Sequence, residues 1–160
     1  PGPRRRYDGP NAGGSSICSE VMSMQLLIAC EDAEFYKREV EILYDETGAI
    51  TDYAVKIEGD IIGVSVTRAY LGPFEMNYTP DDADTLLVKK LEGVLESTQN
   101  VSDVDRWTKQ VLHIWTLNDA WVDTLETVWE GLDAATKADT IVLVTVESGS
   151  DFVVTDSCDD

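Results

Sequence analysis

The sequence has 160 residues, of which 43% are hydrophobic and 27% charged, and its 31 acidic and 12 basic residues give a formal net charge of −19. This length suits one globular domain, and no apolar run approaches the roughly 20 residues of a membrane-spanning helix. An acidic surface repels phosphate backbones, which disfavours nucleic acid and favours a basic protein as partner. A homo-oligomer is the other partner expected. The same charge also suits a solubilising surface without a specific partner.

The composition divides the chain into three parts. Residues 1–16 are rich in Arg, Gly and Pro and are expected to form a flexible arm, residues 17–146 a single α/β domain, and residues 147–160 an acidic tail. No secretory signal follows the arginines of the arm. The cysteines, which form neither a disulfide framework nor a paired metal motif, are expected to be spectators in a reducing intracellular compartment, cytoplasmic or organellar; they are Cys18, Cys30 and Cys158.

The first part of the domain is expected to contain one helix followed by three strands. Ser16 can cap a helix that runs to about Cys30, and the buried stripe of that helix is expected to comprise Ile17, Val21, Met24 and Ile28. Strand-forming residues then predict strands over 35–44, 51–57 and 61–69.

The second part alternates helices and strands. The run Thr79-Pro80-Asp81-Asp82 joins a capping hydroxyl, a first-turn proline and two acids, which predicts a helix that extends to about Ser97. Strands are expected over 111–117 and 140–146. The helix between them, capped by Asn118 or Asp119, has an apolar face of Trp121, Val122, Leu125, Val128, Trp129 and Leu132. The predicted order is αβββαβαβ.

A polar ladder is expected on one face of the hairpin formed by the second and third strands. If Gly59 and Asp60 form its two-residue turn, Asp52 lies opposite Thr67, and Ser65 shares their face. This ladder is either a solvated sheet face or part of a site.

Lys90 falls inside the apolar stripe of the helix that begins after Thr79, beside Leu87, Leu91 and Val94. A lysine in that position either extends its stem to reach water or meets a carboxylate, for which Asp52 is the expected partner. His113 is the only histidine of the chain and lies within a predicted strand, either as a packed core residue or as a general base.

The order of elements resembles the PD-(D/E)XK, or restriction-endonuclease-like, superfamily. The resemblance implies an α/β (α+β) fold with a mixed sheet flanked by helices, and it places Asp52 at the superfamily's catalytic aspartate. Ser65 and Thr67 stand where its Glu-x-Lys motif would be, so the motif is degraded. Some members carry the lysine on the crossing helix, where Lys90 lies, or take a carboxylate from the first helix, where Glu20 lies.

A second resemblance spans nearly the whole chain. Its pattern is similar to that of the uncharacterised eukaryotic AAC-rich-mRNA-clone-like family and comprises Asn11–Ser15, Thr51–Tyr53, Gly63–Ala69, Lys89–Leu91 and Gln110–Trp115. No activity is implied by this resemblance.

Two functions follow as hypotheses. The chain is a nuclease-fold protein without catalysis, serving as a subunit or adaptor of a larger assembly. Alternatively, it is an Mg²⁺-dependent nuclease in which Asp52, with Glu20 or Glu41, holds the metal, and Lys90 orients the attacking water. A site occupied by other side chains would favour the adaptor, and open carboxylates would favour the enzyme.

Overall fold

The computed structural model describes residues 2–9, 16–75 and 77–157. Its centre is a five-stranded mixed sheet with the strand order β1-β2-β3-β4-β5. The first three strands pair antiparallel and the last two add in parallel. The strands are β1 (Glu34–Arg38), β2 (Tyr53–Ile57), β3 (Asp60–Arg68), β4 (Lys109–Thr116) and β5 (Ile141–Val146).

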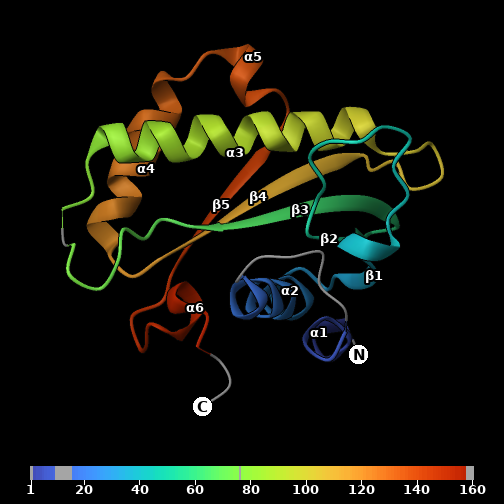
Figure 1. Ribbon diagram of the computed structural model, residues 1–160, viewed down its shortest axis with the longest axis horizontal. Coiled ribbons are helices and arrows are strands. Elements are labelled where there is room, and N and C mark those ends of the chain that lie inside the picture. Colours follow the sequence, from blue (N-terminus) through green and yellow to red (C-terminus); the bar gives the residue numbers. More distant parts are fainter. Residues whose placement is uncertain (1, 10–15, 76, 158–160) are drawn as a thin grey trace.

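Helices cover both faces of this sheet (Figure 1). One face carries α1 (Gly2–Tyr7), α2 (Ile17–Cys30) and α6 (Phe152–Thr155), and the other carries α3 (Pro80–Asn100) and α4 (Asp119–Gly131). The 3₁₀ helix η1 (Glu39–Glu41) follows β1, and α5 (Ala134–Lys137) precedes β5. The elements from α2 to β5 include the predicted αβββαβαβ order, which is thereby confirmed. Among the described residues, no helix is both long and apolar enough to cross a membrane.

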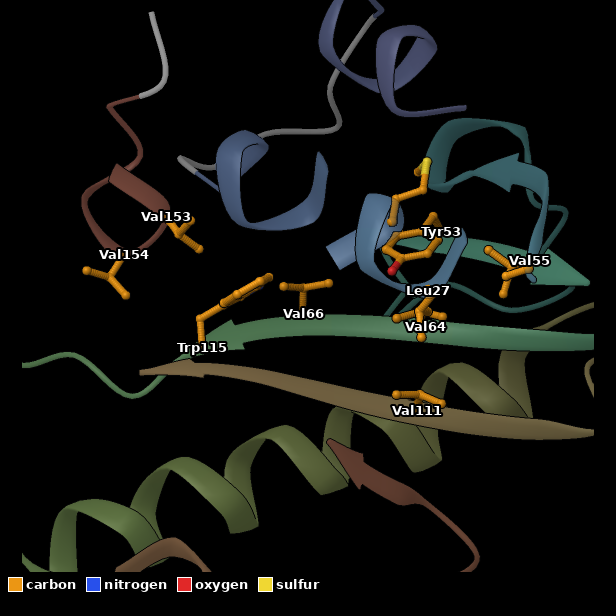
Figure 2. Close-up of a cluster of buried hydrophobic side chains, with 11 residues drawn as sticks. Leu27, Tyr53, Val55, Val64, Val66, Val111, Trp115, Val153 and Val154 are labelled. Atoms are coloured by element: carbon orange, nitrogen blue, oxygen red, sulfur yellow. The ribbon is translucent and has the colours of Figure 1, made fainter. Parts of the chain in front are cut away.

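The core beneath α2 joins residues that are far apart in the sequence (Figure 2). Met24 and Leu27 of α2 pack against strand residues such as Val64 and Trp115, and Val153 and Val154 of α6 close the same cluster. Of the predicted apolar stripe of α2, only Met24 is fully buried, and polar positions such as Glu20 and Ser23 face inward instead. The prediction holds for Met24 and in part for Ile28, which packs against the same cluster, and it is wrong for Ile17 and Val21. The inward positions next to them are polar because Glu20 meets Arg6, and Ser23 meets His113, beneath this helix.

The core on the opposite face agrees with the sequence patterns. Thr79 caps α3 as predicted and forms a capping box with Asp82, and Asn118 caps α4. Trp121 and Leu125 are buried against α3 and the sheet, with Val128 and Leu132 packed beside them. The predicted inward face of α4 is therefore confirmed.

The β2–β3 hairpin has a different turn from the predicted one. Ile57 pairs with Asp60, so the two turn residues are Glu58 and Gly59, with φ angles of 52° and 93°. A tight hairpin turn of this kind requires positive φ at both positions. Compared with the prediction, the register is shifted by two residues, so every side chain keeps its face while its cross-strand neighbour changes.

The segments outside the predicted domain also carry structure. Within residues 1–16, helix α1 buries Arg6, and within residues 147–160, helix α6 contacts α2. Cys18 is disulfide-bonded, and its backbone N–H donates to Asp156 Oδ1 at 2.7 Å. The expectation of spectator cysteines is therefore wrong for Cys18. Cys30 is a free, exposed thiol, whereas Cys158 lies outside the described residues, as do residues 11–15 of the family pattern.

Candidate functional site

A buried carboxylate cluster, defined here as the buried Glu20 and Glu39 together with the half-buried Asp52, lies where α2, η1 and the start of β2 meet. Glu20 is 1% exposed and Glu39 7% exposed. The backbone N–H of Glu39 donates to the carbonyl oxygen of Asp52 at 2.9 Å, which fixes η1 against the residue before β2. Ionised carboxylates in such a setting need a cation or hydrogen-bond donors.

The cation is Arg6 of helix α1. Its side chain is fully buried, its Nε donates to Glu20 Oε2, and its Nη2 lies 3.4 Å from Glu39 Oε1. Ser16 donates to the second oxygen of Glu20 at 2.6 Å. Burial acts to lower the pKa of Arg6, but the hydrogen bond and negative charge of Glu20, with the charge of Glu39, outweigh it and raise the pKa. Arg6 therefore stays charged and balances part of the negative charge of the two glutamates.

Asp52 differs from the two glutamates because no cation lies within ion-pair distance of it among the described residues. Its Oδ2 accepts a hydrogen bond from the backbone N–H of Val66 at 2.6 Å. Burial, reinforced by the negative charge of Glu20, raises the pKa of Asp52 to about 7, although the Val66 hydrogen bond and the charge of Lys90 act in the opposite direction. Asp52 therefore titrates near neutral pH, which is a property common at functional sites.

Glu41 lies apart from the cluster in a second ion-pair group near the surface. Its Oε1 lies 2.6 Å from Arg5 Nη2 and 3.1 Å from Arg38 Nη2. The hydrogen bond from Arg38 is the main reason that the pKa of Glu41 falls to about 2. Two consecutive arginines of α1 thus contact two of the three carboxylates that the sequence suggested as metal ligands.

The remaining predicted residues, Lys90, Ser65 and Thr67, surround Asp52 less closely. Lys90 is half-buried, and its charge acts on Asp52 without an ion pair within 4 Å in the part of the chain that the structure describes. The hydroxyls of Ser65 and Thr51 lie 3.1 Å apart and share a hydrogen bond. Thr67 is buried, and the shifted register moves it away from its predicted position opposite Asp52.

A divalent metal does not fit this arrangement. Hard cations such as Mg²⁺ need several oxygen ligands that converge on one point. Glu20 is engaged by Arg6 and Ser16, and Glu41 by arginines, so neither presents a free carboxylate edge to Asp52. Among the described residues, no group of three or more His, Cys, Asp or Glu side chains has a geometry that could hold a metal ion.

Arg6 and Glu39 are the site residues that sequence reasoning missed. Arg6 stood in a glycine- and proline-rich stretch typical of an arm, and Glu39 stood within a predicted strand that in fact ends at Arg38. The available signal was the run of three arginines, since a strongly acidic chain offers many partners to any arginine close to its core.

His113 belongs to a separate buried network beneath α2. Its Nδ1 lies 2.7 Å from Ser23 Oγ and its Nε2 lies 2.9 Å from Thr145 Oγ1, while Ser23 also hydrogen-bonds with the hydroxyl of Tyr53 at 2.6 Å. Burial lowers the pKa of His113 to about 4. Ser23 and His113 are both fully buried, so this pair orders the core rather than meeting a substrate.

The chain is homologous to the AAC-rich mRNA clone AAC4 protein of Dictyostelium discoideum, to which it is 39% identical over 159 residues. The alignment covers 95% of this chain and 23% of the relative, so the chain spans about a quarter of the length of that protein. No protein-family model matches the sequence, and no solved structure matches the fold. The resemblance to the AAC-rich-mRNA-clone-like pattern is thus supported by homology.

Proposed function

We propose that this chain is a nuclease-like α/β domain without catalytic activity that serves as a binding subunit of a protein assembly. One observation carries the proposal: the guanidinium of Arg6 forms ion pairs with Glu20 and Glu39. It thereby engages the carboxylates next to Asp52 with which a nuclease of this kind would hold its metal. The order αβββαβαβ, the position of Asp52 before β2 and the replacement of Glu-x-Lys by Ser65 and Thr67 support the nuclease-like ancestry.

Charge and burial explain why Arg6 would be hard to replace by a metal. A metal would have to displace a fully buried guanidinium and leave it without its carboxylate partners, and breaking a buried ion pair costs about 3 to 5 kcal/mol. Asp52, whose pKa is about 7, would also have to lose a proton near neutral pH before it could act as a ligand. Both requirements oppose metal binding in the same pH range.

The partner that the charge favours is a protein with a basic surface. A formal charge of −19 on 160 residues attracts cationic surfaces over distances of about one Debye length. A second copy of the chain would have to overcome repulsion between like charges, which makes self-association the less favoured arrangement.

A metal titration tests the proposal directly. We expect calorimetric titration of the chain with Mg²⁺ or Mn²⁺ to give no saturable heat near neutral pH, and we expect no cleavage of single- or double-stranded DNA or RNA. The Asp52→Asn variant is the control for contaminating nucleases. Cleavage by the wild-type chain that Asp52→Asn abolishes would refute the proposal.

An Mg²⁺-dependent nuclease is the second candidate, favoured by the effect of the Lys90 charge on Asp52. If Arg6 blocks an otherwise competent site, Arg6→Ala should create metal-dependent cleavage that requires Lys90. If Arg6→Ala remains folded and inactive, the nuclease hypothesis is excluded.

A further inference from the structure

The two edges of the sheet are protected very differently. At β1, the register is interrupted between Phe35 and Lys37, the strand carries charged residues, and helix α1 packs alongside. Bulges, charges and covering helices are the usual means by which proteins prevent another chain from pairing with an edge strand.

In the described part of the chain, strand β5 has none of these protections. It is the last strand of the sheet and pairs only with β4 in the described part of the chain (Figure 1). Its six residues are uncharged, free of proline and almost all β-branched, with the sequence IVLVTV. Ile141 is 53% exposed, and the other five side chains are only partly buried. Such an edge can accept an additional strand by main-chain hydrogen bonding.

An apolar cleft of about 330 Å³ lies beside this edge. It is formed by β5 together with α3 and α4, and its lining residues are Leu87, Val122, Leu125, Glu126, Trp129, Val142 and Val144. When a peptide adds to a sheet edge, the backbone supplies affinity, and a pocket that receives one of its alternate side chains supplies specificity. Edge and cleft share Val142 and Val144, so one extended segment could contact both.

The charges around the cleft indicate what should flank that segment. Among the described residues that line the cleft, Glu126 is the one that is charged, and Glu147 directly follows β5. One basic side chain lies at the margin, because Lys137 Nζ is 5.3 Å from the centre of the Trp129 ring. The net charge of the whole chain has the same sign. Lysine or arginine next to an apolar side chain would therefore be favoured, and a second copy of the acidic chain would be disfavoured.

We propose that the edge of β5 and its cleft form a docking site for an extended peptide segment that adds as a sixth strand. The segment places an apolar side chain in the cleft and carries basic residues beside it. This inference goes beyond the proposed function and is independent of the Arg6 site, since none of its residues belongs to the buried carboxylate cluster.

A display library of random nonapeptides provides the probe. We expect selection on the wild-type chain to enrich peptides with alternating apolar residues and flanking Lys or Arg. Val122→Asp places a charge in the cleft. It should therefore lower the affinity of the chain for a synthetic copy of an enriched peptide by about tenfold or more. Thr127→Asp is the matched control, because Thr127 is an exposed residue of α4 outside the cleft, and it should bind as the wild type does. Equal melting temperatures would establish that both variants fold.

Backbone N-methylation of the synthetic peptide at alternate residues separates strand addition from simple apolar contact. Because methylation removes the N–H donors that pair with β5, we expect binding to be lost. Failure to enrich any peptide, binding that survives both Val122→Asp and N-methylation, or dimerisation of the chain that Ile141→Lys abolishes would each overturn the proposal. Metal-dependent cleavage by this chain would refute the proposed function and leave this site unaffected.

Discussion

Replacing Asp52 by Asn should make the chain more stable at neutral and alkaline pH. Asn keeps an oxygen that can accept the hydrogen bond from the N–H of Val66, and it removes the charge whose burial raises the pKa of Asp52. Protonated Asp52 makes its full contribution to stability at pH values below the pKa of Asp52 in the unfolded chain. This contribution is lost as the pH rises through the pKa of Asp52 in the folded chain. Asn has no proton to lose and avoids that loss.

The magnitude follows from the two pKa values. The pKa of Asp52 rises from its ordinary value of 3.8 to about 7 in the folded chain. At 1.36 kcal/mol for each pKa unit, this difference corresponds to about 4 kcal/mol between acidic and alkaline conditions. We therefore compare the free energy of unfolding of Asp52→Asn with that of the wild type at each pH. The difference in favour of the variant should grow by about that amount between about pH 4 and about pH 8, with most of the change below pH 7.

Urea denaturation of both proteins across this pH range measures the difference. His113 changes stability in the opposite direction, because its pKa is lowered to about 4 by burial and its contribution is lost as the pH falls below its ordinary value of 6.5. Since both proteins contain His113, its effect cancels in the difference. A difference that does not vary with pH would mean that Asp52 titrates normally and is not desolvated in the folded chain.

Three further substitutions test the packing and the charges. Arg6→Met should destabilise the chain by about 3 to 5 kcal/mol by leaving buried carboxylates without their cation, whereas Arg4→Met, at an exposed side chain, should leave the denaturation midpoint unchanged. Leu125→Ala should cost about 2 to 5 kcal/mol in denaturant unfolding, because Leu125 is 2% exposed in the α4 core, and an unchanged midpoint would mean that α4 is peripheral. Lys90→Met should lower stability at about pH 8 by removing the charge that favours ionised Asp52. A double-mutant cycle with Asp52→Asn should show that the two substitutions are coupled. A coupling energy of zero would mean that Lys90 does not belong to the site.

The elements that could be predicted are those whose signal is local. The capping run at Thr79 and the apolar period of α4 identified two helices, their starts and their buried faces, because both patterns depend on neighbouring residues alone. The order of helices and strands along the chain was predicted for the same reason. The turn at Glu58 and Gly59 was misassigned because a non-glycine residue with positive φ is uncommon, and the sequence offered Gly59 and Asp60 as an equally plausible pair.

The candidate site was predicted only in part because its partners are distant in sequence. Asp52 and Glu20 were recognised, and the structure brings their charges together. The residue that controls the cluster, Arg6, comes from a six-residue helix, which has no stability of its own and forms through tertiary contacts. No local pattern could show that this arginine enters the core, since its burial depends on carboxylates supplied by α2 and η1.

The contacts of α2 with both α1 and α6 have a consequence for the order in which the chain can fold. The hydrogen bond between Cys18 and Asp156 joins residues 138 positions apart, and Val153 and Val154 complete the cluster that Met24 and Leu27 begin. During synthesis, the apolar face beneath α2 stays incompletely covered until the segment after β5 has emerged from the ribosome. Contacts of such long range slow folding and leave apolar surface exposed to aggregation meanwhile. A chain shortened before Phe152 should therefore retain its sheet but bind hydrophobic dyes and chaperones.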